Sequence, residues 1–193
     1  MKLIFICVGE SELCTEKYND TCRRLTPLGR IQSYAIEARL KNEPIDAVLV
    51  SSLNSSLDTY KFSFKNRSNI KAISSDTIRE YVSNQDNYRR NIDNLISEYP
   101  DIDFKYLIDS EDFYKCNNIC DDNISIENRC TSLDILLSTK DTHITTHEYN
   151  GSLVIISHKE FLNKFMELYG SKYGIYTNNG FVEGEVRYGY INH

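Results

Sequence analysis

KLIFICVGES, residues 2–11, contains an apolar run that stops at Gly9. A short apolar run ended by a turn residue is typical of a strand buried on both faces of a parallel sheet. Two similar runs, Ala47–Val50 and Leu153–Ile156, follow later in the chain, and a serine comes directly after each. These three stretches predict the central strands of a parallel sheet.

Helical patterns alternate with these runs. Thr26 is a good N-cap and Pro27 a good first residue for a helix that the apolar spacing carries to Leu40. A weaker helix over Ser55–Phe64 leads to a third strand, Ile70–Ile73. This order predicts a parallel sheet with right-handed crossovers. Further helices are expected over Arg89–Tyr99, Ser125–Leu137 and Glu160–Tyr169, and further strands over Gly174–Thr177 and Glu183–Tyr190.

The stretch 74–150 is more irregular and polar than the rest. No flexible linker brackets it, so we interpret it as an insertion over the cleft, not as a separate domain. Residues 1–193 are thus expected to form one α/β domain. The predicted architecture is a three-layer sandwich, in which a mostly parallel sheet has helices on both faces.

The composition narrows the class of protein. A net charge of -6 argues against broad nucleic-acid binding, and no apolar run is long enough to span a bilayer. The N-terminal run lacks a cleavage site, so it predicts a strand instead of a signal peptide, and an intracellular, reducing location is expected. An excess of Asn, Ile, Lys and Tyr suggests an AT-rich source genome, such as that of a large DNA virus.

Neither a cofactor nor a metal is expected. Cys116 and Cys120 are four residues apart, but no second ligand pair follows them. His143 and His147 have the same spacing, in a stretch that favours a surface loop. We expect free thiols at all six cysteines, which are Cys7, Cys14, Cys22, Cys116, Cys120 and Cys130.

Three motifs lie at the carboxyl ends of predicted parallel strands, where open α/β sheets place their ligand sites, and a fourth lies at the start of the first predicted helix. They are Ile6–Ser11, Leu25–Gln32, Ser51-Ser52 and Ser157-His158. In this order they resemble the histidine-phosphatase (phosphoglycerate-mutase-like) superfamily. Its members read R-H-G-E-S after strand one, then L-T-x-x-G-x-x-Q, S-S-x-x-x-R and, late in the chain, S-H. The resemblance covers nearly the whole chain.

The resemblance implies phosphoryl transfer through a phosphohistidine. In the family, a histidine attacks phosphorus and an acidic residue protonates the leaving oxygen. Two arginines and a second histidine hold the phosphoryl oxygens. By the same resemblance, Glu80 occupies the position of the acid and His158 that of the second histidine.

The remaining catalytic positions depart from the family. Val8 stands where the nucleophilic histidine would be, Cys7 stands at the preceding arginine, and Ser56 stands at the second arginine. Valine has no lone pair and cannot carry a phosphoryl group. Losing one preorganised donor to an oxyanion costs about 3 kcal/mol, and here several are missing. The sequence therefore predicts a site without its nucleophile and without most of its positive charge, in which His158 is the main remaining donor.

The retained residues also have simpler interpretations. Glu80 could be a solvated loop carboxylate, and His158 a satisfied cap or core histidine. Arg89-Arg90 fits a solvated helix face better than an anion-binding rim. Cys7 could in principle act as a thiolate nucleophile, but acidic neighbours would raise the pKa of its thiol and repel phosphate.

Three functions remain open from the sequence. The leading hypothesis is a catalytically inactive pseudoenzyme that serves as a binding or scaffold module, for a protein partner or for a small anion in the degenerate pocket. The alternative is a weak or rerouted phosphomonoesterase that uses His158 and Glu80. The third is a structural or virion-associated protein whose old pocket has no role.

Overall fold

A six-stranded sheet organises the molecule, with strand order β4-β3-β2-β5-β1-β6. The computed structural model describes residues 1–12, 23–67, 70–81, 88–107, 121–139, 151–176 and 178–191. The neighbouring strands pair in parallel except β6, which runs antiparallel to β1. The strands are β1 Lys2–Cys7, β2 Ile45–Ser51, β3 Lys71–Ser75, β4 Ile102–Asp103, β5 Ser152–Ser157 and β6 Val186–Tyr190. The predicted mostly parallel sheet is confirmed.

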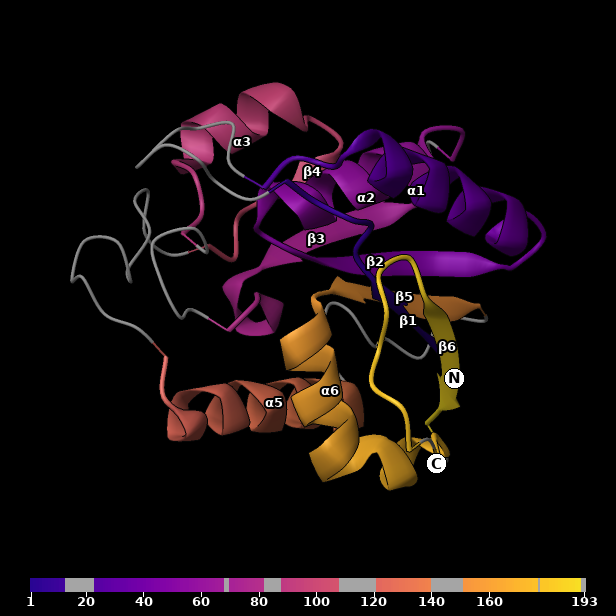
Figure 1. Ribbon diagram of the computed structural model, residues 1–193, viewed down its shortest axis with the longest axis vertical. Helices are drawn as coiled ribbons and strands as arrows, with labels where there is room; N and C mark the ends of the chain where they lie inside the picture. The colour runs from indigo at the N-terminus through magenta and orange to yellow at the C-terminus, as the bar shows by residue number, and fades with distance from the viewer. Residues whose placement is uncertain are drawn as a thin grey trace.

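Helices cover both faces of this sheet, as the sequence predicts (Figure 1). α1 and α2 lie on one face, and α5 and α6 lie on the other. Among the described helices, none is both long and apolar enough to cross a membrane. The helices are α1 Pro27–Leu40, α2 Asn54–Phe64, α3 Ile92–Glu98, α5 Asn123–Ser138 and α6 Lys159–Tyr169, with short 3-10 helices at Asp76–Ile78 and Gly170–Tyr173.

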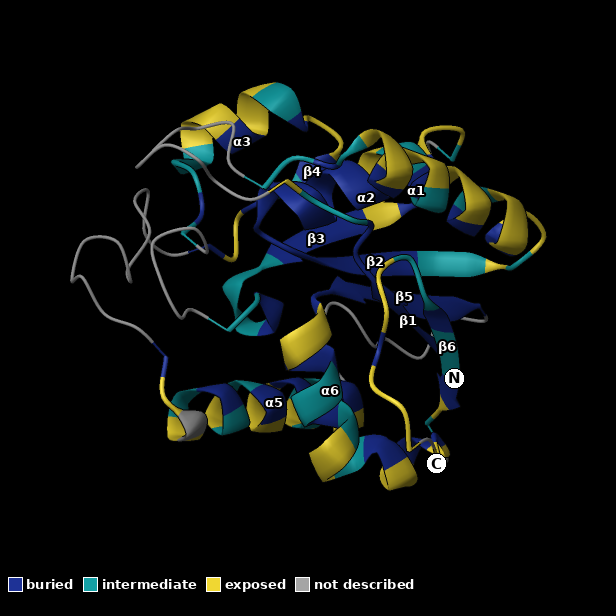
Figure 2. Ribbon diagram, viewed as in Figure 1, coloured by how far each residue is buried: buried dark blue, intermediate teal, exposed yellow. Residues whose placement is uncertain are grey.

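The alternation of side chains along β1 divides the core into two clusters. Leu3, Phe5 and Cys7 belong to the cluster under α5 and α6, whereas Ile4, Ile6 and Val8 belong to the cluster under α1 and α2. Successive side chains of a strand point to opposite faces, so a strand that is apolar throughout must be covered on both sides. Figure 2 shows the resulting buried layer through the centre of the molecule.

The start of α1 is fixed against the end of β1. The Thr26 hydroxyl accepts a hydrogen bond from the Gly29 amide at 3.0 Å, which satisfies a free N–H of the first turn. Gly9 and Gly29 let the two backbones meet, because a methyl group on Gly9 would lie 2.6 Å from the Gly29 carbonyl oxygen. The Thr26 cap and the close contact between Gly9 and Gly29 therefore hold the loop after β1 in place.

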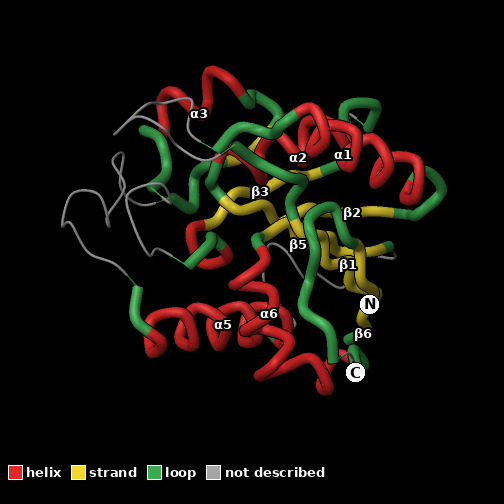
Figure 3. The backbone as a smooth tube through the Cα atoms, in the orientation of Figure 1, coloured by secondary structure: helices red, strands yellow, loops and turns green. Residues whose placement is uncertain are grey.

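One predicted strand is wrong. Within Gly174–Thr177, the described residues 174–176 form no strand. Gly174 has φ +73° and ends a 3-10 helix, and the Ile175 amide donates to the Gly170 carbonyl at 2.9 Å. An amide that donates within a turn cannot also donate to a neighbouring strand. Figure 3 shows the chain leading into β6 as loop.

The stretch 74–150 supplies α3, β4 and α5. α3 is shorter than the expected Arg89–Tyr99 helix, because the Asn91 side chain caps it by accepting from the Asp93 amide at 2.8 Å. The interpretation of 74–150 as a cap stays a prediction, since residues 82–87, 108–120 and 140–150 lie outside the described part of the chain.

Candidate functional site

His158 lies where β5 ends and α6 begins, beside the carboxyl end of β2. Its Nε2 is 2.9 Å from the Ser51 hydroxyl oxygen and 2.7 Å from the Ser56 hydroxyl oxygen. His158 is 4% exposed and Ser56 is fully buried. The Nε2 nitrogen is thus already hydrogen-bonded within the protein.

The His158 imidazole is held in its neutral form. Its pKa is lowered to about 3, first by burial and then by the positive charges of Arg23, Arg79 and Arg129. Burial disfavours the imidazolium because the charged ring would lose its hydration. At neutral pH, His158 therefore has a lone pair but no positive charge to offer an anion.

We predict that His158 makes the protein sensitive to acid. Between pH 6.5 and about 3 the unfolded chain protonates this ring and the folded protein does not, so stability falls as the pH is lowered. The expected slope is about 1.4 kcal/mol per pH unit. Urea denaturation of the wild type and of His158→Gln across this range measures it. The same slope in both proteins would contradict the prediction.

Val8 and Cys7 are the residues that the sequence motif aligns with the family's nucleophile and its preceding arginine. The Val8 side chain is 6% exposed and packs in the α1–α2 core cluster. Cys7 is buried on the other face, and burial, followed by Glu183, Glu80 and Glu185, raises the pKa of its thiol. These three carboxylates are not the acidic residues that follow Cys7 in the sequence, Glu10 and Glu12, but the shift has the direction that the sequence predicts. Cys7 therefore stays a thiol at neutral pH.

Glu80 follows the 3-10 helix Asp76–Ile78 after β3 and is partly buried. Its Oε1 accepts a hydrogen bond from the Tyr81 amide at 2.9 Å. Burial raises the pKa of this carboxyl, with a further contribution from Glu160, while the Tyr81 amide and Arg23 act in the opposite direction. Glu80 is therefore not the fully solvated carboxylate of the simpler interpretation.

Positive charge near His158 comes from Arg23, Arg79 and Arg129, none of which stands at the two arginine positions that the resemblance implies. Arg129, on α5, donates to the Arg79 carbonyl at 2.7 Å and pairs with Asp121 at 2.6 Å. Arg23 has φ +56°, which is unusual for a residue other than glycine. Within the described residues, its buried Nε meets no hydrogen-bond acceptor.

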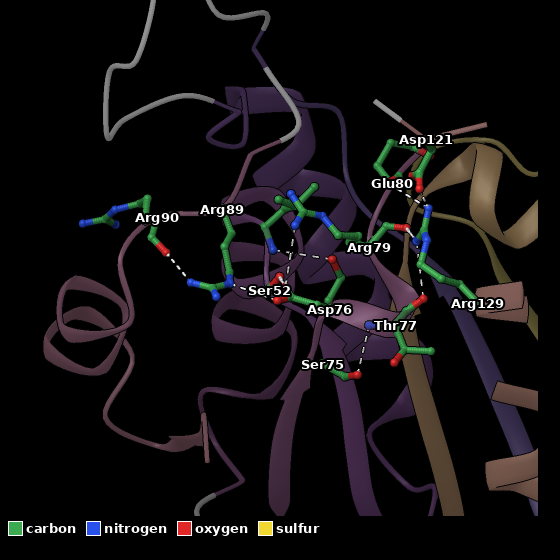
Figure 4. Close-up of polar contacts among 12 residues, drawn as sticks. Ser52, Ser75, Asp76, Thr77, Arg79, Glu80, Arg89, Arg90, Asp121 and Arg129 are labelled. Atoms are coloured by element: carbon green, nitrogen blue, oxygen red, sulfur yellow. Dashed lines mark hydrogen bonds and ion pairs between the residues drawn. The ribbon is translucent and has the colours of Figure 1, made fainter. Parts of the chain in front are cut away.

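Arg89 and Arg90 do not form a solvated helix face; both precede α3. The Arg89 side chain is buried, and its Nε pairs with Asp76 Oδ2 at 3.0 Å. Asp76 also accepts a hydrogen bond from Ser52, and Figure 4 shows Arg79 and Arg89 approaching it from two sides. Arg90 pairs with Glu98 at 2.5 Å. These arginines tie the loops after β2 and β3 to α3.

Several solved structures share the fold of this chain. The alpha-ribazole phosphatase of Shigella flexneri aligns over 97% of this chain and 89% of its own, with TM-score 0.56 and 17% identity. YhfR of Bacillus stearothermophilus aligns over 97% and 89%, with TM-score 0.61 and 15% identity. A mycobacterial glucosyl-3-phosphoglycerate phosphatase aligns over 97% and 88%, with TM-score 0.56 and 11% identity. No protein-family model and no curated protein matches the sequence. The chain has the histidine-phosphatase fold.

The histidine-phosphatase fold brings some of the predicted site residues together. His158 and Ser56 are in direct contact, and Glu80 lies close enough to Cys7 to raise the pKa of the thiol. Arg79 could have been suspected from its place directly before Glu80, whereas nothing in the sequence marked Arg23 or Arg129. Other expectations lie outside the described residues, at Cys14, Cys22, Cys116, Cys120, His143 and His147.

Proposed function

We propose that this protein is a histidine-phosphatase-like pseudoenzyme, which uses the fold as a binding or scaffold module without phosphohistidine chemistry. The observation that carries the proposal is Val8, an apolar side chain packed into the core at the position of the nucleophile. A phosphoryl group needs a nitrogen lone pair at that position, and no described histidine other than His158 is available to offer one.

The other residues of the candidate site support the same proposal. Ser56 replaces the second arginine and fills its place with a hydroxyl that bonds His158. Val8, Ser56 and His158 are all buried, so a phosphate would have to displace internal contacts to reach the imidazole. Arg79 and Arg89 both form ion pairs with Asp76, at 3.9 Å and 3.0 Å.

An assay with phenyl phosphate tests the proposal. We expect no turnover above the uncatalysed rate at any pH between 4 and 9, and no difference between the wild type and His158→Ala. Turnover that His158→Ala abolishes would overturn it. Circular dichroism of the variant checks that the fold is retained.

The alternative, a weak phosphomonoesterase, is favoured by the protonation states of two residues. His158 is neutral, as a nucleophile must be, and the raised pKa of Glu80 suits a general acid. Two serine hydroxyls at Nε2 work against it. Mass spectrometry under conditions that preserve phosphohistidine separates the two functions: an adduct at His158 would support the alternative, and an unmodified His158 would support the pseudoenzyme.

A further inference from the structure

A cavity of about 440 Å³ lies between the second half of α2, the end of α3 and β4. Its lining includes neither His158 nor Ser56. On α2 the lining begins at Tyr60, one helical turn beyond Ser56, and reaches Phe64, which lies about 12 Å further along the helix axis than Ser56. The cavity falls within the size range of small-molecule sites. Its lining consists of Tyr60, Lys61, Phe64, Lys65, Arg67, Ile70, Glu98, Tyr99, Pro100, Asp101 and Ile102.

The floor of this α2–α3 cavity is apolar and aromatic. Tyr60 and Phe64 stack with ring centroids 5.5 Å apart and planes 19° apart. Tyr99, Ile70 and Ile102 complete the floor and are buried. Flat aromatic and branched side chains of this kind favour contact with a planar ring.

The rim carries two lysine side chains from α2. Lys61 and Lys65 are exposed and one helical turn apart, and in the described chain neither forms an ion pair. Their ammonium groups lie over the rings of Tyr99 and Tyr34, at 5.5 Å and 4.6 Å from the centroids. Like charges at this spacing destabilise a helix, so an anion between them would be favoured.

The two carboxylates that line the cavity, Glu98 and Asp101, differ in whether an arginine neutralises them. Glu98 is already held by Arg24 at 2.6 Å and Arg90 at 2.5 Å, which lowers the pKa of its carboxyl to about 2. Asp101 is exposed and opposes an anion. Burial, and next Asp101, raise the pKa of Tyr60 to about 12, so its hydroxyl keeps its proton and can donate.

We propose that the α2–α3 cavity binds a small aromatic molecule that carries an anionic group, either a carboxylate or a phosphate. The ring lies against Tyr60, Phe64 and Tyr99, and the anion lies near Lys61 and Lys65. None of the residues of the site around His158 takes part in this inference, so a test of one proposal does not decide the other.

Titration with benzoate, phenyl phosphate and neutral benzyl alcohol, followed by amide chemical shifts in NMR spectra, tests it. We expect the two anions to shift the amides of residues 60–65 and 99–102, and benzyl alcohol to bind several-fold more weakly. The tighter of the two anions identifies the anionic group. Raising the salt concentration should weaken both.

Charge variants give the sharper test. Exposed charge contacts are each worth up to about 1 kcal/mol, which is about fivefold in affinity. Lys61→Ala with Lys65→Ala should weaken benzoate binding about tenfold and leave benzyl alcohol unchanged, whereas Asp101→Asn should strengthen it about threefold. Lys41→Ala, an exposed lysine at the end of α1, is the matched control and should have no effect.

Three results would overturn the proposal. One is the absence of shifts around the cavity at millimolar ligand. Another is equal binding of benzoate and benzyl alcohol. The third is shifts confined to residues near His158, which would place the anion at the family's site instead.

Discussion

Replacing Asp58 by alanine is expected to lower the free energy of unfolding by about 3 kcal/mol. The Asp58 carboxylate is buried on α2, and it accepts from the Tyr99 hydroxyl at 2.8 Å and the Leu25 amide at 3.4 Å. It also pairs with Arg24 at 3.0 Å. Without this carboxylate, the buried Tyr99 hydroxyl loses its hydrogen-bond acceptor, and Arg24 loses one of its two ion pairs and keeps the one with Glu98. Urea denaturation measures the difference.

Two further variants show whether the carboxylate itself is responsible. Asp58→Asn keeps an acceptor for Tyr99 and loses the charge, so its effect should be smaller. Asp103→Ala removes a carboxylate whose partner, Lys105, is exposed, and it should cost less than about 0.5 kcal/mol. If Asp58→Ala destabilises no more than Asp103→Ala, the buried network does not hold α2 and α3 together.

Gly29→Ala is expected to be nearly as damaging, at about 3 kcal/mol. A methyl group on Gly29 would overlap the Glu10 carbonyl and lie 3.0 Å from the Glu10 amide nitrogen. These are backbone atoms, and the same carbonyl accepts from the Thr26 amide at 3.0 Å, so the loop after β1 cannot move aside without losing that bond. Thermal unfolding followed by circular dichroism measures the loss.

Gly174→Ala is the matched control, because it separates backbone strain from collision. Gly174 has φ +73°, but a methyl group there would meet nothing within 4 Å. Its cost should be about 1 kcal/mol, from the left-handed backbone alone. Equal losses for Gly29→Ala and Gly174→Ala would show that close packing of the loop on α1 is not needed.

The sheet could be predicted because the signals for its central strands are local. An apolar run such as Leu3–Ile6 must be covered on both faces, and a Thr26-Pro27 pair sets a helix start without help from distant residues. Gly174–Thr177 failed for the opposite reason. Its apolar Ile175 resembles a strand residue, but hydrogen bonds back to the 3-10 helix at Gly170–Tyr173 take its amide.

The candidate site was only partly predictable. Motif order led to Glu80 and His158, but not to the positive charges near His158, because Arg23 and Arg129 are far from His158 in the sequence and act on it only in the fold. Arg89 was misjudged because its partner Asp76 lies 13 residues earlier in the chain. An arginine is buried only where a carboxylate pairs with it, and the sequence around the arginine does not show whether the fold brings such a partner close.

The contact between Ser56 and His158 also bears on how this sequence can change. An arginine at position 56 would put a buried guanidinium beside the imidazole, whose protonation the positive charges of Arg23, Arg79 and Arg129 already disfavour. A histidine at position 8 would put a polar ring among the apolar side chains of the α1–α2 cluster. A designed variant that carries only one of the two residues, an arginine at position 56 or a histidine at position 8, is therefore expected to lose stability.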